Sequence, residues 1–219
     1  SSDLSTFSGS INGSINLGRI GGGTHVFNSP LAFTGGLILM GGTTRLSDDS
    51  TILNISSLDI NYGTLELHNN ASLQNQISNR VADSLPITLR GGSITFNGRV
   101  STMATETLGA VTAVEGVSTI TANTGGGTIT GADLTIASLT RNSGAIVNFA
   151  GTNIGQQGNN ARIVFTAPLS TVAGGALGAW AIANSTDYAA YNTGNGVGIV
   201  GQGGYTGYKI GRASCRERV

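Results

Sequence analysis

The amino-acid sequence predicts an all-β fold, a right-handed parallel β-helix of about seven imperfect coils, each roughly 24–31 residues long. Three observations predict it. Gly, Thr, Ser and Asn fill 102 of the 219 positions, whereas charged residues account for only 10% and aromatic residues for 5%. A glycine followed by alternating apolar residues recurs along the chain. The segments between these glycines are short and β-branched, as in strands that have one buried face and are joined by tight turns.

The composition excludes a disordered linker and disfavours a helix-rich enzyme. Hydrophobic residues make up 39% of the chain and the mean hydropathy is +0.12, which is enough apolar material for a core. The corners of a coil need positive φ or side chains that bond to their own backbone, and Gly and Asn supply these. Thr and Ser suit outward strand faces, where like charges stacked about 5 Å apart would repel each other. The low charge content therefore follows from the predicted geometry.

The glycine motif sets the expected length of a coil. In chain order, it begins at Gly9, Gly36, Gly63, Gly92, Gly116, Gly144 and Gly175. The sequence numbers of successive glycines differ by 27, 27, 29, 24, 28 and 31. A repeat of about 27 residues with three short strands and three turns is typical of one coil of a parallel β-helix, in which each strand stacks on its counterpart in the next coil.

Strands are expected directly after five of these glycines, at 36–40, 63–67, 92–96, 116–120 and 144–149. Further strands are expected between the glycines, at 51–55, 58–60, 85–89, 108–114, 128–130, 134–136, 162–166 and 197–200. These segments alternate apolar and small polar residues and are bounded by Gly or Asn, which indicates half-buried strands. Helical spacing is nearly absent.

Two of these segments resemble the core of the autotransporter-associated β-strand repeat. They are 62–67 (Tyr-Gly-Thr-Leu-Glu-Leu) and 91–96 (Gly-Gly-Ser-Ile-Thr-Phe). Segments 105–111, 134–141, 144–149 and 177–181 are similar to the longer units of very large repeat proteins from planctomycete-like environmental bacteria. The resemblance covers most of residues 9–200, and the first 35 residues and those from 181 onward depart from the consensus.

The resemblance implies a location and a shape but no catalytic residue. It implies a structural or adhesin-like β-helical passenger that is secreted or exposed on the bacterial cell surface, and associated with the outer membrane through a C-terminal part beyond this sequence. Glycans or other cell-surface material are the expected partners. Two alternatives stay open: a carbohydrate-active β-helix enzyme, which requires three or more charged side chains converging in a groove, and a carbohydrate-binding module.

The two ends of the sequence are expected to differ from the rest. Residues 1–209 are predicted to form the solenoid, irregular from about 181, and to lack flanking repeats, because the chain begins with neither Met nor a signal peptide. Residues 210–219 contain three of the eleven basic residues and the only Cys, and resemble a translated sequencing adapter, so we expect them to be non-native. Without them 8 basic residues face 10 acidic ones, which disfavours nucleic-acid binding. No apolar run is long enough for a membrane-spanning helix.

No metal or phosphate motif is present. The two histidines, His25 and His68, have no His or Cys at ligand spacing, and an outward strand face or a turn is the expected setting for both. Asp48 and Asp49 lack the glycine-rich nonapeptide of calcium-binding β-rolls. The segment 18–23 lacks the Lys and Ser or Thr of a phosphate loop, so we interpret it as a glycine turn. No cofactor is expected.

Four acidic residues lie about one coil apart and could therefore meet in a two-carboxylate catalytic site. They are Asp59, Asp83, Glu106 and Asp133. Such a site needs two acids within about 5 to 10 Å. Asp59 and Asp83 precede their glycines by four and nine residues, so we expect the acids to occupy different faces.

Five aromatic residues gather near the end of the chain and are the candidate glycan contacts. They are Trp180, Tyr188, Tyr191, Tyr205 and Tyr208. Exposed rings on one face would bind sugars, whereas rings that close the end of a solenoid would be buried.

Overall fold

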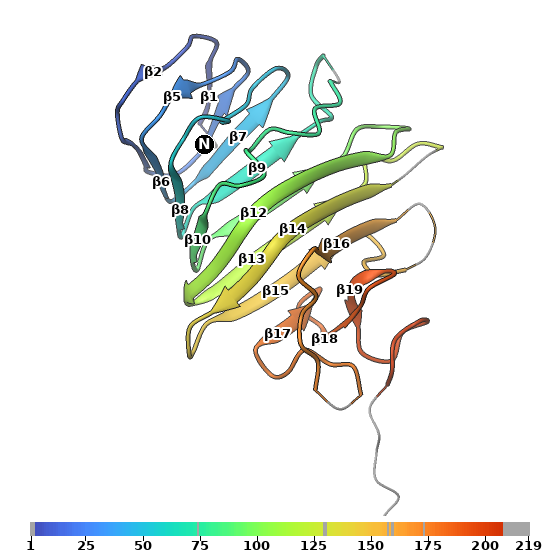
Figure 1. Cartoon of the computed structure of the whole chain (residues 1–219). Coiled ribbons are helices and arrows are strands. Elements are labelled where there is room, and N and C mark those ends of the chain that lie inside the picture. Colours follow the sequence, from blue (N-terminus) through green and yellow to red (C-terminus); the bar gives the residue numbers. More distant parts are fainter. Residues whose placement is uncertain are drawn as a thin grey trace, which may run out of the picture.

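The computed structural model describes residues 3–73, 75–128, 131–156, 158, 160–172 and 174–207. The chain forms a parallel β-helix, winding repeatedly through two long sheets and one short sheet (Figure 1). This confirms the predicted fold class. The described residues form no helix, so no helix among them is long and apolar enough to cross a membrane.

Sheet I, the longest sheet among the described residues, has ten strands. In spatial order they are β1 (Leu4–Phe7), β4 (Thr24–Phe27), β7 (Thr43–Ser47), β9 (Thr64–His68), β11 (Ser93–Asn97), β13 (Val117–Asn123), β15 (Ile146–Gly151), β17 (Ala181–Ala183), β18 (Asp187–Asn192) and β19 (Gly196–Ile199). The pairs from β1 to β17 are parallel, whereas β18 pairs with β17 and with β19 in antiparallel fashion. The regular winding therefore stops at β17.

Sheets II and III complete the coils. Sheet II contains β3 (Leu17–Ile20), β6 (Gly36–Met40), β8 (Ser57–Asn61), β10 (Ile87–Arg90), β12 (Ala104–Glu115), β14 (Ala132–Arg141) and β16 (Ala161–Phe165). Sheet III contains β2 (Asn12–Gly13) and β5 (Ala32–Phe33). Sheet III forms the third face of the solenoid in the first coils, and a single bridge between Ile52 and Val81 continues this face. In the following coils the long strands β12 and β14 extend over it.

The inward side chains stack into one continuous core. Along sheet I, one buried row consists of Phe27, Leu46, Leu67, Phe96 and Ala122, which are in register in successive strands. Leu, Ile and Val from sheet II pack against them in a single cluster. The alternation of apolar and small polar residues produces this arrangement, because successive residues of a strand point to opposite faces.

The coil length differs from the prediction in the first coils. Thr24 pairs with Thr43, and Thr43 pairs with Thr64, so the sequence numbers of these partners differ by 19 and by 21. The difference is 29 between Thr64 and Ser93 and 26 between Ser93 and Thr119. The predicted coil length is thus wrong for the first three coils and right for those that follow, up to β15.

The reason is that the glycine motif occurs at the starts of strands in two different sheets. Gly36 begins β6 in sheet II and pairs with Ser57 of the next coil. Gly63 precedes β9 in sheet I, so it is not the counterpart of Gly36. The spacing of 27 between these two glycines therefore crosses from one face to another and does not measure a coil.

Most predicted strands are confirmed, at the bounds given above. The strand expected at 51–55 is absent, because only Ile52 pairs there. The motifs that begin at Gly9 and Gly175 also form no strand. Residues 129 and 130 of the strand expected at 128–130, and the tail at 210–219, lie outside the described residues.

Candidate functional site on the outer face of sheet I

Polar side chains form two adjacent rows on the outward face of sheet I. The first row consists of Arg45, Glu66, Thr95 and Thr121, which are direct neighbours in β7, β9, β11 and β13. The second row, two residues further along each strand, consists of Ser47, His68, Asn97 and Asn123. Because strands of successive coils lie in register, side chains from distant parts of the sequence meet on one surface.

Glu66 lies at the centre of these rows and is nearly buried by its neighbours. Arg45 donates from Nε to Glu66 Oε2 at 2.7 Å. Asn97 donates from Nδ2 to Oε1, also at 2.7 Å, and His68 Nδ1 lies 3.2 Å from the same oxygen. Both carboxylate oxygens are therefore engaged.

The carboxylate of Glu66 remains charged. Burial alone would raise its pKa, but hydrogen bonds and favourable charge interactions with His68 and Arg45 outweigh burial and leave the pKa below its usual value. A carboxyl group with a lowered pKa is a poor general acid near neutral pH. Glu66 is thus arranged to hold its neighbours in place.

The amide side chains extend this network toward the C-terminal coils. Asn123 donates from Nδ2 to Asn97 Oδ1 at 3.0 Å, and Asn97 Nδ2 lies 3.3 Å from His68 Nδ1. Stacked amides of this kind satisfy each other along a solenoid without introducing charge. Together with Glu66, they fix the orientation of the His68 ring.

A cavity of about 300 Å³ opens beside this network. Arg45, Ser47 and His68 line it from the sheet, and Asp48 and Ser72 line it from the turns that follow β7 and β9. Asp48 is held there by accepting a hydrogen bond from the backbone N–H of Leu73 at 3.0 Å. The lining therefore combines hydrogen-bond donors and acceptors with one cationic and one acidic side chain.

Of the four acidic residues that the sequence places one coil apart, Asp59, Glu106 and Asp133 do not meet, whereas the negative charge of Asp83 helps to raise the pKa of Glu106. Asp59 lies in register with Thr88 and Thr112, whereas Asp133 lies seven residues before Thr140, the partner of Thr112, in the part of β14 that extends over the third face. The two acids therefore lie on different faces, and each pairs with an arginine, Arg90 and Arg162 respectively. Because β14 is the third strand after β8 in this sheet, the two acids are at least about 14 Å apart. Glu106 points into the core, and its side chain is only 1% exposed. These three acids form no two-carboxylate site.

Glu106 belongs instead to a buried polar cluster that the sequence did not indicate. Its carboxylate accepts the backbone N–H of Arg80 at 2.9 Å and that of Val81 at 3.1 Å. The Arg80 side chain is fully buried, and it donates to Asn69 Oδ1 at 2.7 Å and to the carbonyl of Ser50 at 2.8 Å. This cluster pins the long connection between β9 and β10 to the core.

His25 lies in the inward row of sheet I, in register with the buried residues Thr44 and Leu65, so the expected outward setting is wrong for this histidine. His25 Nδ1 lies 2.6 Å from Ser5 Oγ in the neighbouring strand, and its ring packs edge-on against Phe27. In the glycine turn at 18–23, Arg19 donates to the carbonyls of Gly21 and Gly23 at 2.6 and 2.8 Å. Because carbonyl oxygens rather than N–H groups converge there, the turn is not arranged to hold a phosphate. Among the described residues no three His, Cys, Asp or Glu side chains are grouped to hold a metal ion.

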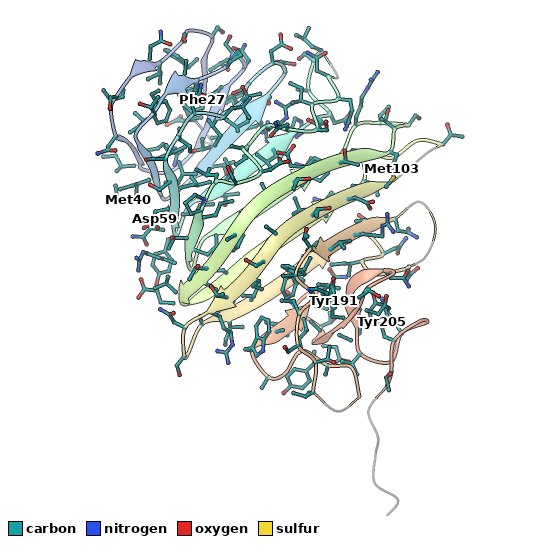
Figure 2. The ribbon with its side chains drawn as sticks, in the orientation of Figure 1. Phe27, Met40, Asp59, Met103, Tyr191 and Tyr205 are labelled. Atoms are coloured by element: carbon teal, nitrogen blue, oxygen red, sulfur yellow. The ribbon has the colours of Figure 1, made fainter. Side chains whose placement is uncertain are left out.

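The late aromatic residues do not share one exposed face. Tyr191 is only 7% exposed, and its hydroxyl bonds to the backbone of Phe165 inside the solenoid (Figure 2). Trp180 packs edge-on against Phe149 and lies under the guanidinium of Arg141.

The two remaining described tyrosines of this group differ in exposure. The Tyr205 hydroxyl donates to the carbonyl of Gly196 at 3.0 Å, and burial raises its pKa. Tyr188 is 45% exposed. Tyr208 lies outside the described residues. Most of these rings therefore pack at the C-terminal end of the core.

Comparison of the chain with protein families, with curated proteins and with solved structures finds no match. The function proposed below is therefore argued from the residues and their geometry.

Proposed function

We propose that this chain is a structural repeat region of a secreted or cell-surface protein, adhesin-like and without catalysis. In this proposal the solenoid is a rigid spacer that holds other parts of the protein away from the cell, while its polar faces meet glycans or neighbouring cells. The observation that carries the proposal is the continuity of the core. Inward rows run through successive coils of sheets I and II without a break, so each coil supports the next.

The distribution of charge on the outer faces also supports a structural role. Arg45 stacks directly on Glu66, and Asp133 stacks directly on Arg162. Most other outward positions carry neutral Thr, Ser or Asn, as in the row of Thr88, Thr112 and Thr140. Opposite charges in register attract where like charges would repel, so these pairs are arranged to hold coils together.

A surface-display experiment tests the spacer role. The chain is placed between a membrane anchor and a fluorescent reporter on bacterial cells, and energy transfer from the reporter to a membrane dye is measured. Seven coils at about 4.8 Å each separate the reporter from the anchor by roughly 30 Å, so transfer falls. The matched control Leu67→Asp places a charge in the core, and unfolding replaces the single fixed separation by the broad distribution of distances of a random chain. A reporter that stays close to the membrane with the natural chain contradicts the proposal.

Secretion is part of the proposal and has its own test. Protease treatment of intact source cells, followed by mass spectrometry of the released peptides, detects the chain if it is exposed on the surface. Recovery of its peptides only after the cells are lysed contradicts surface exposure.

One observation favours a second candidate, a carbohydrate-active enzyme. Arg45, Glu66 and His68 converge beside a cavity, which is the kind of cluster that such an enzyme requires. The lowered pKa of Glu66 and its fully engaged oxygens favour the structural reading, because neither oxygen is available to exchange a proton with a substrate. Incubation with neutral and uronate polysaccharides, with Glu66→Gln as the control, tests this candidate. Release of reducing ends by the natural chain but not by the variant would establish it.

A further inference from the structure

Tyr62 breaks the residue pattern of one corner of the solenoid. This corner joins sheet II to sheet I, and in four neighbouring coils its first residue is Gly21, Gly41, Gly91 or Gly116, all with positive φ. In the coil between Gly41 and Gly91 the equivalent residue is Tyr62, with a φ of 53°. The backbone at this corner thus keeps a conformation that favours glycine while carrying a large ring.

This conformation is unfavourable for a tyrosine. The other described non-glycine residues with positive φ are Asp48, Ser101, Asn153, Asn184 and Ser185, which are small and polar. Asn and Asp tolerate the left-handed region best, whereas a bulky side chain there is an outlier. Such outliers persist where the surrounding structure enforces them, and they concentrate at functional positions.

The ring of Tyr62 lies against the backbone of the next coils. A Cβ atom on Gly91 would come within 2.7 Å of Tyr62 Cε1, and one on Gly116 would lie 3.8 Å from the Tyr62 hydroxyl oxygen. Glycine at position 91 therefore provides space that the ring occupies, whereas a side chain at position 116 would only be in ordinary contact with it. The tyrosine is nevertheless 71% exposed, so the other side of the ring faces solvent.

Hydrogen-bonding side chains form the last row of sheet II before this corner. Asn61, Arg90 and Glu115 are direct neighbours in β8, β10 and β12, in the row next to the corner. Arg90 bonds to Asp59 at 3.2 Å and to Glu115 at 3.4 Å. Met40, which bridges to Tyr62, and Asp59 lie along the same edge of the molecule (Figure 2).

We propose that this corner binds a neutral sugar unit of a polysaccharide. A pyranose ring with equatorial hydroxyls has an apolar C–H face that matches an exposed aromatic ring, and hydroxyls at its rim that match the amide, guanidinium and carboxylate beside it. Asp59 and Glu115 give two negative charges against one positive charge on Arg90, which disfavours acidic sugars. The site is separate from the Glu66 network and does not depend on the spacer role.

The test measures the binding of neutral hexasaccharides to the full chain. Cellohexaose, laminarihexaose and mannohexaose are the probes, hexagalacturonate is the acidic comparison, and saturation-transfer NMR and calorimetry give contacts and affinity. We expect at least one neutral probe to bind and hexagalacturonate to bind at least about tenfold more weakly. Tyr62→Phe keeps most of the affinity, whereas Tyr62→Gly loses at least about tenfold.

Tyr62→Gly also separates binding from folding. Glycine suits a φ of 53°, so the thermal midpoint of this variant is expected to equal or exceed that of the natural chain. Leu73→Gly is the control, because it removes another exposed apolar side chain, from the turn after β9 rather than the corner before it, and leaves binding unchanged. If none of the three neutral probes binds, the proposal is overturned, and Tyr62 then contacts either a protein partner or no partner. Equal affinity of Tyr62→Gly and the natural chain overturns it as well, and neither result affects the spacer test.

Discussion

The carboxylate of Glu106 accepts the backbone N–H of Arg80 at 2.9 Å inside the solenoid, while the guanidinium of Arg80 turns away to other partners. Two groups of opposite charge are thus buried together without a direct side-chain ion pair. Burial raises the pKa of Glu106 to about 8, and the N–H donors and the positive charge of Arg80 offset only part of this effect. Burial likewise lowers the pKa of Arg80 to about 10.

Glu106 makes the stability of the fold dependent on pH. Its pKa is 4.5 in the unfolded chain and about 8 in the fold, so between these values the folded state binds a proton that the unfolded state lacks. The stabilisation of the fold by this proton is complete below pH 4.5 and is lost as the pH rises through about 8. The loss is on the order of a few kcal/mol. Denaturant unfolding at pH 5 and pH 9 measures this loss. Glu106→Gln should remove most of the difference, and an unchanged difference in this variant would refute the assignment.

Glu66 has the opposite pH dependence. Because its pKa is lowered in the fold, it stabilises the fold above its ordinary pKa of 4.5, and this stabilisation disappears as pH falls through the folded value. Glu66→Gln is expected to lower the free energy of unfolding at pH 7 by about 1 to 3 kcal/mol, since the variant loses charged hydrogen bonds with Arg45 and His68. Thr95→Ala, the next residue in the same row, is the control. Equal stability of the two variants at pH 7 would argue against the ion pair.

Tyr191→Phe should weaken the C-terminal end of the fold. The Tyr191 hydroxyl bonds to both the N–H and the carbonyl of Phe165 at 3.2 Å, and phenylalanine leaves these buried groups without that partner. The expected loss is about 1 to 3 kcal/mol. Hydrogen exchange of the Phe165 amide should rise while that of Leu67 stays unchanged. The same substitution at Tyr188, which is 45% exposed, should leave both amides unaffected.

Tyr62→Gly is expected to stabilise the fold by up to about 1 kcal/mol. The left-handed conformation costs a non-glycine residue about 1 to 2 kcal/mol, and the contact of the ring with Gly91 recovers part of that cost. Thermal and denaturant unfolding measure the change. Tyr62→Ala, which keeps the strain and loses the ring, should be less stable than both. A marked destabilisation by glycine would mean that the ring holds the corner together.

The strands and the fold class were predictable from the sequence because the local pattern of residues repeats along the chain. The register in which strands of successive coils pair was not predictable. The alternating residues of β9 and β11 identify them as strands without knowledge of the rest of the chain. Register depends on which glycines are counterparts, and Gly36 and Gly63 carry the same local motif in different sheets. Sequence spacing alone cannot separate two faces that begin with the same residues.

The same limit explains which side-chain pairs the sequence could reveal. Asp133 and Arg162 lie in register and their sequence numbers differ by 29, so the expected coil length predicts their contact. The numbers of Arg45 and Glu66 differ by only 21, and a period of 27 places Ser72 beside Arg45 instead. No pattern in the sequence indicates that Arg80 is buried, because its burial depends on the long connection between β9 and β10 folding back over the core. The conformation of Tyr62 does carry a signal, a tyrosine at a corner where the neighbouring coils have glycine.

The unequal coils give the solenoid a graded response to tension. Each strand of sheets I and II pairs with those of the adjacent coils, so a force along the axis peels turns away one after another. A turn of about 20 residues, as in the first coils, releases about 7 nm of extended chain, and a later turn of about 29 residues releases about 10 nm. Stretched from both ends, the molecule would lengthen in short steps and long steps, each marking the part of the winding that had opened.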